Sequence, residues 1–310
     1  MVVVKTGVAN WQADRLADLS GKSYVITGGN SGIGFEAARI LAGRGGHVII
    51  AARNPEKAGA AADALRREHG GDNIATVQLD LASLASVRSA AAELKDSGVK
   101  IDALINNAGI MQTPKSQTQD GFETQFGTNH LGHFLWTALL FDQVAAAQGR
   151  IVTVSSIAHR YGRIRFNNLM MSSGYDAMQA YCQSKLANLV FALELHRRLK
   201  ASNSAVASIA CHPGYSNTAL QSTGPAALMA AIYSVTNVLF AQSAKRGCLP
   251  TVLSAAGTEA VSGAYFGPTG LRELKGPVGD AAVSRAARND ETGKRLWEVS
   301  EQLVDHSWLS

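Results

Sequence analysis

The stretch Thr27-Gly28-Gly29-Asn30-Ser31-Gly32-Ile33-Gly34 decides how this 310-residue chain folds. It joins a short apolar run at residues 23–27 to a helical pattern that begins at Gly32. Glycines in such a stretch permit a tight turn, a close approach of the backbone to a bound group, and close packing of the helix on the strand. The free amides at the start of the helix also favour phosphate groups. The stretch therefore predicts a strand, a turn and a helix arranged to hold phosphate.

The glycine spacing in this loop, Gly-x-x-x-Gly-x-Gly, is wider than the Gly-x-Gly-x-x-Gly of many dinucleotide-binding loops. The alternative is a glycine-rich turn that binds no ligand. We expect the loop to hold the pyrophosphate of a dinucleotide through Gly28, Asn30, Ser31, Gly32, Ile33 and Gly34.

Short apolar runs rich in strand-forming residues alternate with longer helical patterns along the chain. Seven runs predict strands, at residues 23–27, 47–51, 75–80, 103–106, 150–155, 205–211 and 263–266. Helical patterns fall at residues 32–43, 55–68, 84–96, 121–147, 175–200 and 293–303. This alternation predicts a Rossmann fold of the α/β class, whose seven-stranded, mostly parallel sheet has helices on both faces. No linker divides the chain, so we expect a single domain over residues 1–310, with residues 1–21 as an N-terminal extension.

Composition and charge exclude several classes of protein. Hydrophobic residues make up 46% and charged residues 17% of the chain, as in globular proteins rather than disordered or fibrous ones. The basic residues behind the net charge of +5 are dispersed, so we expect no nucleic-acid partner. Three scattered cysteines show no metal-like spacing and favour a reduced compartment. The first residues do not read as a secretory signal and no run predicts a membrane span, so we expect a cytoplasmic protein.

Polar and glycine-containing segments follow several of the predicted strands. Asn106-Asn107-Ala108-Gly109 ends the fourth strand, Ser155-Ser156 ends the fifth, and Pro213-Gly214 follows the sixth. In an open parallel sheet, the ligand lies beyond the carboxyl ends of the strands. We therefore expect these segments to surround the same site as the glycine loop.

The end of the second predicted strand indicates which dinucleotide is bound. An acid commonly stands there when NAD is bound, because it accepts a hydrogen bond from the ribose. This chain instead has Ala52 followed by Arg53. An arginine can pair with the 2′-phosphate of NADP through charge-assisted hydrogen bonds, helped by Asn30 and Ser31 in the glycine loop. We therefore expect NADP(H) as cofactor, the alternative being that Arg53 is an exposed residue at the start of a loop.

A second informative stretch is Tyr181-Cys182-Gln183-Ser184-Lys185. Residues four apart on a helix share a face, so the Lys185 ammonium can favour the phenolate of Tyr181, whose ordinary pKa is about 10. Such a tyrosine can act as an acid or base near neutral pH. Alone, the spacing is a weak indication, because a packed tyrosine beside a solvated lysine gives the same pattern.

Taken together, these residues resemble the short-chain dehydrogenase/reductase family over nearly all of the chain. Three motifs resemble its retinol dehydrogenase and protochlorophyllide reductase branch: Thr-Asn-His-Leu-Gly-His-Phe at residues 128–134, Tyr-Cys-Gln-Ser-Lys-Leu-Ala-Asn at 181–188, and His-Pro-Gly at 212–214. The resemblance implies that Tyr181 is the acid or base and that Lys185 holds the nicotinamide ribose and lowers the pKa of the tyrosine. It further implies that Ser156 holds the substrate oxygen and that Asn129 supports a proton path to Lys185.

The choice of Ser156 over Ser155 follows the family pattern, in which the catalytic serine is usually the second of such a pair. Alternation along a strand also lets only one of the two face the site. The alternative is a packed serine pair that ends a strand.

The resemblance also implies further cofactor contacts. Asp80 and Thr218 have an alternative role as helix caps, and Asn129 as an ordinary helix residue. The implied contacts near the adenine are Asp80 and Leu81. Those along the ribose and pyrophosphate are Asn107, Ala108 and Gly109. Those around the nicotinamide carboxamide are Pro213, Gly214 and Thr218.

These features predict an enzyme that transfers hydride between NADP(H) and an alcohol or carbonyl group of a small, lipophilic molecule. Two alternatives stay open: reduction of a carbon–carbon double bond, as in protochlorophyllide reductase, and a non-catalytic protein that senses dinucleotides. We expect residues 215–242 to form a substrate lid, with a dimer contact as the alternative, and residues 159–174 to shape the mouth of the site. The resemblance implies a homodimer or homotetramer through the helices at 121–147 and 175–200.

Overall fold

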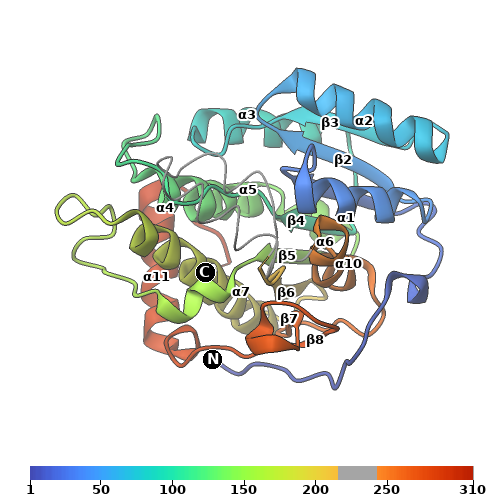
Figure 1. Cartoon of the computed structure of the whole chain (residues 1–310). Coiled ribbons are helices and arrows are strands. Elements are labelled where there is room, and N and C mark those ends of the chain that lie inside the picture. The colour runs from blue at the N-terminus through green and yellow to red at the C-terminus, as the bar shows by residue number, and fades with distance from the viewer. Residues whose placement is uncertain (216–242, 310) are drawn as a thin grey trace, which may run out of the picture.

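A sheet of eight strands forms the centre of the protein, in the order β3-β2-β1-β4-β5-β6-β7-β8 (Figure 1). The computed structural model describes residues 1–215 and 243–309. The strands from β1 to β7 pair in parallel, and β8 pairs antiparallel with β7. They are β1 (Ser23–Thr27), β2 (His47–Ala52), β3 (Ile74–Gln78), β4 (Ala103–Asn106), β5 (Arg150–Val154), β6 (Ala207–Cys211), β7 (Tyr265–Pro268) and β8 (Val278–Asp280).

The seven predicted strands are all present, with small shifts at their ends, and the α/β fold is confirmed. Strand β8 is an addition to the seven-stranded prediction. It has 3 residues, one of them Gly279, so it carries no alternation of apolar and polar residues that would reveal it.

The helices cover both faces of this sheet, as expected. Helices α1 and α2 with α10 pack in one hydrophobic cluster, and α3, α5, α7 and α11 pack in another. Their bounds are α1 (Gly32–Ala42), α2 (Pro55–His69), α3 (Leu84–Asp96), α5 (Gly132–Leu139), α7 (Ala177–Ala201), α10 (Leu249–Ala256) and α11 (Asp290–Val304). Helix α10 and the short α9 (Ala244–Gly247) were absent from the prediction.

The helix predicted at residues 121–147 is divided into four pieces. A short α4 (Thr124–Phe126) runs into a π-helical segment, η2 (Gly127–Leu131), then α5, and after a break at Leu140 the chain forms α6 (Phe141–Ala146). Glu123 caps the first turn through hydrogen bonds from the amides of Gln125 and Phe126. A π-helical segment is uncommon and often lies at a functional site.

The sequence order of the strands reverses between β1 and β4, which lie side by side. The chain moves outward from β1 to β2 and β3 and then returns to β4, so the loops after β1 and β4 leave in opposite directions. This reversal opens a crevice at the carboxyl ends of the two strands, where ligands bind in open α/β sheets. The fold therefore places the glycine loop and the segment Asn107-Ala108-Gly109 on either side of one crevice.

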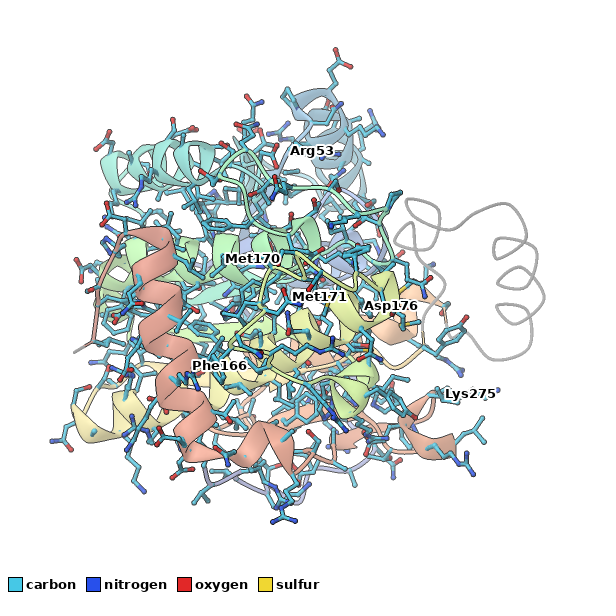
Figure 2. The ribbon with its side chains drawn as sticks, turned by 90° about the vertical axis from the view of Figure 1, so that its left-hand side faces the viewer. Arg53, Phe166, Met170, Met171, Asp176 and Lys275 are labelled. Atoms are coloured by element: carbon cyan, nitrogen blue, oxygen red, sulfur yellow. The ribbon has the colours of Figure 1, made fainter. Side chains whose placement is uncertain are left out.

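The long connection between β5 and α7 packs along the side of the protein that α11 also covers. Figure 2 shows Phe166, Met170 and Met171 in this connection, with Asp176 at its end. The guanidinium of Arg295 on α11 lies 4.2 Å from the ring centre of Phe166. Asp176 caps α7 by accepting a hydrogen bond from the amide of Gln179.

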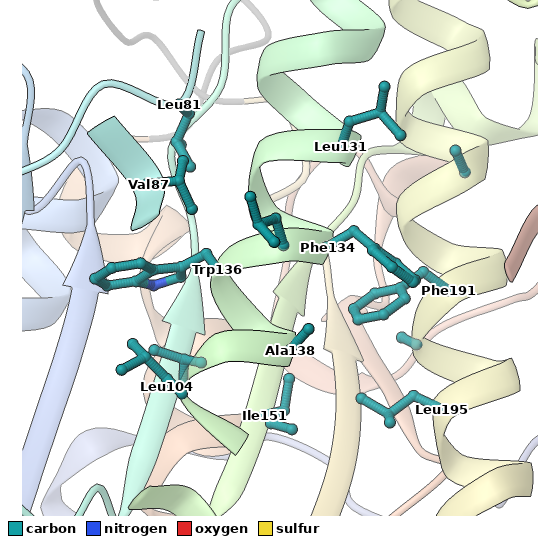
Figure 3. Packing of buried hydrophobic residues seen from close by; sticks show 14 of the residues in the cluster. Leu81, Val87, Leu104, Leu131, Phe134, Trp136, Ala138, Ile151, Phe191 and Leu195 are labelled. Atoms are coloured by element: carbon teal, nitrogen blue, oxygen red, sulfur yellow. The ribbon is translucent and has the colours of Figure 1, made fainter. Parts of the chain in front are cut away.

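Helix α11 also covers the helices that sequence analysis assigned to a dimer interface. Figure 3 shows Phe134 of α5 and Phe191 of α7 close together in the core. The ring centre of Trp297 on α11 lies 5.1 Å from that of Phe134 and 5.8 Å from that of Phe191. Residues 180–195 of α7 are all buried within the single chain. Helix α11 therefore covers the parts of α5 and α7 around Phe134 and Phe191, and the homodimer or homotetramer stays a prediction.

The N-terminal extension runs along the β7–β8 edge of the sheet. Val4 pairs with Ala264 and Trp11 with Val278 in isolated bridges, and the amides of Thr6 and Gly7 donate to the carboxylate of Asp280. Within residues 1–215 and 243–309, no helix combines the length and apolarity needed to cross a bilayer.

Candidate active site

A cavity of about 860 Å³ lies along the carboxyl ends of the parallel strands. Among the described residues, its lining includes every predicted cofactor and catalytic residue except Asn129. Thr218 and nearly all of the predicted lid, residues 216–242, lie outside the described residues, whereas Tyr215 lines the cavity. The predicted residues that line it are Gly28, Asn30, Ser31, Gly32, Ile33, Gly34, Arg53, Asp80, Leu81, Asn107, Ala108, Gly109, Ser156, Tyr181, Lys185, Pro213 and Gly214.

Two glycines of the loop are required by its geometry. Gly28 has φ +70°, and a Cβ there would lie 3.1 Å from the Cβ of Ala108. A Cβ on Gly34 would collide with the carbonyl oxygen of Gly28 and lie 2.6 Å from Nδ2 of Asn107. The loop therefore presents bare backbone to the cavity beside the first turn of α1, which is the arrangement that a pyrophosphate needs.

Thr27 joins the glycine loop to the segment after β4. Its Oγ1 accepts hydrogen bonds from the amides of Asn107 and Ala108, both at 2.9 Å, and lies 2.8 Å from Nε2 of His133. Because the hydroxyl already accepts twice, its own proton is directed to His133, whose Nδ1 donates to the carbonyl of Asn129 at 3.0 Å. Burial lowers the pKa of His133 to about 4, so the ring is neutral at pH 7, as this pattern requires. Neither Thr27 nor His133 was among the predicted site residues.

Asn129 lies in the π-helical segment η2 and is fully buried behind the cavity. Its Oδ1 accepts from the amide of Ile110, and its Nδ2 donates to the carbonyl of Ile110 and to Oγ of Ser184. The side chain thereby ties the segment after β4 to helix α7. A Cβ on Gly109 would lie 3.2 Å from Nζ of Lys185 and 3.3 Å from Oδ1 of Asn129, so these predicted residues do converge.

The two serines at the end of β5 have different surroundings. Ser155 is buried, and its hydroxyl donates to the carbonyl of Lys185 at 2.7 Å. Ser156 is half-buried, accepts from the amide of Ala158, and forms a side-chain hydrogen bond with Tyr181. Ser155 therefore fixes α7 against the sheet, while Ser156 has its hydroxyl at the phenol.

Burial controls the ionisation of Tyr181 and Lys185. It raises the pKa of Tyr181 to about 12, although the hydrogen bond with Ser156 opposes the shift. It lowers the pKa of Lys185 to about 8, and Nζ donates to the carbonyl of Val154 at 3.3 Å. Burial therefore decides the net direction of the Tyr181 pKa in the protein alone. Nζ of Lys185 lies 5.9 Å from the ring centre of Tyr181, and the lowering of the tyrosine pKa by Lys185 stays a prediction.

At the far end of the cavity, Arg53 follows β2 directly and is exposed, as Figure 2 shows. Asn54 caps α2 by accepting a hydrogen bond from the amide of Lys57 at 2.8 Å. Lys57 also lines the cavity, so a second cation stands near Arg53 that sequence analysis missed. The sequence does indicate Lys57, because it lies in the first turn of the helix after Asn54 and Pro55, and the start of the helix that follows β2 faces the cavity.

Two alternative roles were open for Asp80, a contact near the adenine and a cap of the next helix. It lines the cavity, and its Oδ1 accepts from the amide of Ala82 in the turn before α3. The N-cap of α3 itself is Ser83, whose hydroxyl accepts from the amide of Ser86. Asp80 is therefore not the helix cap.

Most of the residues that line the cavity around Tyr181 were not among the predicted site residues, although Tyr161 belongs to the segment 159–174 that was expected to shape the mouth of the site. Charged side chains among the described lining residues are confined to Arg53, Lys57, Asp80 and Lys185. The remaining side chains near Tyr181 and Lys185 are neutral and mostly apolar: Ile110, Met111, Ile157, Tyr161, Met178, Gln179 and Cys182. They come from loops and helix starts, where no periodic pattern marks them.

Comparisons with known proteins agree with this geometry. The sequence profile of the short chain dehydrogenases matches residues 22–227. Human retinol dehydrogenase 13 is 40% identical over 313 residues, covering 98% of this chain and 90% of that protein. A crystal structure of an uncharacterized protein from Mycobacterium paratuberculosis has a TM-score of 0.80 and 40% identity, covering 96% of this chain and 98% of that one.

A more distant structure holds a cofactor. It is a protein from Beutenbergia cavernae, provisionally assigned as an NAD(P)-dependent gluconate 5-dehydrogenase, with NADP bound at low occupancy. It has a TM-score of 0.63 and 25% identity, and the match covers 80% of this chain and 95% of that one. The matched profile, the close relatives and the converging site residues together show that this chain belongs to the short-chain dehydrogenase family.

Proposed function

We propose that this protein is an NADP(H)-dependent oxidoreductase that interconverts an alcohol and a carbonyl group on a lipophilic small molecule. The observation that carries the proposal is the contact of the Tyr181 phenol with Ser156 inside a cavity that also contains the glycine loop. The cavity volume of about 860 Å³ is ample for a dinucleotide with a small molecule beside it. NADP(H), when bound, supplies or accepts the hydride.

The protein's part in the reaction is to hold the substrate oxygen and to move its proton. Tyr181 is a protonated phenol near neutral pH, because burial raises its pKa to about 12, so it is suited to give its proton to a carbonyl oxygen. Ser156 places a second hydroxyl beside that position and stabilises charge that develops on the oxygen. Lys185 holds the ribose beside the nicotinamide, with Asn129 fixing the backbone behind it.

Preference for NADP(H) is supported by the charges at the adenosine end of the cavity. Arg53 and Lys57 are both exposed cations in its lining, and Ala52 stands where an acid would repel a phosphate. Asn30 and Ser31 supply neutral donors from the glycine loop. The site therefore attracts an additional phosphate on the ribose.

A lipophilic substrate is supported by the neutral, largely apolar lining beyond Tyr181. Met111 and Met178 are flexible side chains that adapt to apolar ligands of irregular shape. No cation other than Lys185 stands at this end among the described lining residues, which disfavours an anionic substrate. Relatives named retinol dehydrogenases, such as human retinol dehydrogenase 13, favour the same class. Free, buried thiols at all three cysteines support a reduced compartment such as the cytoplasm.

The first test is activity on a panel of neutral aldehydes and alcohols, including retinal and long-chain aldehydes. Absorbance follows the oxidation of NADPH by each aldehyde and the reduction of NADP⁺ by each alcohol. We expect turnover that rises with the apolar character of the substrate.

Tyr181→Phe removes only the hydroxyl, so NADPH should still bind while turnover falls by about 10²–10⁴-fold. Near-normal turnover in this variant would remove Tyr181 from the mechanism.

The serine pair provides a second test, with Ser155→Ala as the matched control for Ser156→Ala. Ser156→Ala should reduce turnover by roughly 10²-fold, because one of two donors to the substrate oxygen is lost. Ser155→Ala should instead lower the melting temperature and largely spare turnover, since it removes a hydrogen bond to the carbonyl of Lys185. Steady-state kinetics and thermal unfolding of both variants measure the change in turnover and in melting temperature and so separate the two roles. A larger loss of turnover in Ser155→Ala would show that the two roles have been exchanged.

The third test concerns the cofactor. Hydrogen bonds to charged groups contribute about 1.5–3 kcal/mol, so Arg53→Ala should weaken NADPH binding roughly ten- to a hundredfold and leave NADH binding nearly unchanged. Lys57→Ala should show the same selectivity to a smaller degree. Arg67→Ala, an exposed arginine on α2 outside the cavity lining, is the control for net charge. Fluorescence titration measures each affinity, and equal losses for NADPH and NADH would mean that Arg53 does not contact the 2′-phosphate.

A further inference from the structure

A cluster of polar side chains lies behind Pro213-Gly214, outside the cavity lining. His212 is fully buried, and its Nδ1 accepts a hydrogen bond from the amide of Gly214 at 3.1 Å. This contact requires the proton of the neutral ring to be on Nε2, which lies 3.2 Å from Oε2 of Glu273. Burial lowers the pKa of His212, against the effect of Glu273, so the ring is neutral. Glu273 thus fixes the tautomer that allows His212 to hold the Gly214 amide.

The same carboxylate is held from two other parts of the chain. Its Oε2 accepts from Nη2 of Arg160 at 2.6 Å, and its Oε1 accepts from the amide of Ala282 at 3.0 Å. Burial acts to raise the pKa of Glu273, but the hydrogen bonds from His212 and from the amide of Ala282, together with the charge of Arg160, bring that pKa below its ordinary value. Glu273 is therefore ionised near neutral pH, and both oxygens have partners.

Arg160 connects this cluster to the segment that follows Ser156. It lies in the short helix η3 (Ile157–Tyr161), one residue after His159. Nδ1 of His159 donates to the carbonyl of Ser156 at 2.7 Å, and its Nε2 accepts from the amide of Ser284. The carboxylate consequently links the segment after β5 with the turn after β6.

The backbone is adapted to place Glu273 there. Leu271, Arg272 and Glu273 have φ values of +41°, +54° and +65°, a left-handed run that non-glycine residues rarely adopt. Strand β7 has Gly267 beside the His212 ring, where a Cβ would collide with Nε2. The amide of Tyr215 also donates to the carbonyl of Leu274 at 2.8 Å, so the turn is held to this segment at two points.

From this arrangement we infer that Glu273 is a positioning residue for the cofactor. Through His212 it fixes the Pro213-Gly214 turn at the nicotinamide end of the cavity, and through Arg160 it aligns that turn with Ser156. The inference rests on the proposed function, in which this turn contacts the nicotinamide. Glu273 itself is absent from the cavity lining, so it acts only through these partners.

The test separates the two ends of the cofactor. NADPH contains both ends, whereas adenosine 2′,5′-bisphosphate contains only the adenine, the ribose and the phosphates of the other end. Isothermal titration calorimetry with each probe should show that Glu273→Ala weakens NADPH binding about tenfold and leaves binding of the bisphosphate unchanged. A general loss of structure would weaken both. Glu298→Ala, an exposed carboxylate on α11, is the matched control and should change neither.

Two further variants keep the inference falsifiable. Glu273→Gln preserves the shape of the side chain but loses the ion pair, so it should weaken NADPH binding selectively but less than Glu273→Ala does. If Glu273→Ala fails to fold, Glu273→Gln provides the test of the inference. Adding His212→Ala to Glu273→Ala should cause little further loss, because the two act in one chain of contacts. Equal losses for both probes, or unchanged NADPH binding in Glu273→Ala and Glu273→Gln, would overturn the inference. A wild-type protein that binds neither probe would instead overturn the proposed function, and this inference with it.

Discussion

The hydroxyl of Thr27 holds together the two strands between which the ligand cavity opens. It accepts hydrogen bonds from the amides of Asn107 and Ala108 across the β1–β4 reversal and donates one to Nε2 of His133. Nδ1 of His133 in turn donates to the carbonyl of Asn129. A hydrogen bond from Nδ2 of Asn107 to the carbonyl of Thr27 and the direct pairing of β1 with β4 reinforce this link between the glycine loop and the segment after β4. The close fit of Gly28 and Gly34 against that segment depends on the distance between the two. The site is thus built on a buried hydroxyl that never enters the cavity.

Burial is the second constraint, and it shifts the pKa values of Tyr181 and Lys185, the proposed catalytic pair, in opposite directions. Both Tyr181 and Lys185 are enclosed by α7 and the sheet, so each is driven toward its neutral form. For the phenol this keeps the proton that a carbonyl oxygen needs. Burial lowers the pKa of Lys185 to about 8, so its ammonium form still predominates at pH 7. This partly desolvated ammonium can donate a hydrogen bond to a nearby phosphate or ribose hydroxyl. The protein alone therefore favours the proton-donating state.

Much of the fold and the site could be predicted from the sequence because local signals and topology agree. The apolar runs predict seven strands, and the rule that ligands lie at the carboxyl ends of parallel strands groups Gly28, Arg53, Asn107, Ser156 and Pro213 at one site. What stayed hidden depends on distant contacts. Strand β8 exists only because Val278 and Asp280 pair with β7. The π-helical segment at Asn129 and the role of Glu273 depend on partners far along the chain.

The direction of the Tyr181 pKa could not be predicted for a related reason. Helical spacing shows that Lys185 shares a face with Tyr181, but it does not show how completely both are removed from water. Likewise, the apolar surfaces of α5 and α7 indicate burial without identifying the covering element, which is α11 of the same chain. The pattern of apolar residues shows which helix faces are buried, whereas only the tertiary structure shows which element covers them.

The most direct measurement is the destination of the hydride. The purified protein would be given an α,β-unsaturated aldehyde with a long apolar tail and NADPH carrying deuterium at the transferable position of the nicotinamide. Mass spectrometry and NMR of the product then locate the label. The account predicts an allylic alcohol with a single deuterium on the former carbonyl carbon. A saturated aldehyde with deuterium on a former alkene carbon, or no transfer to any substrate of this class, would contradict it.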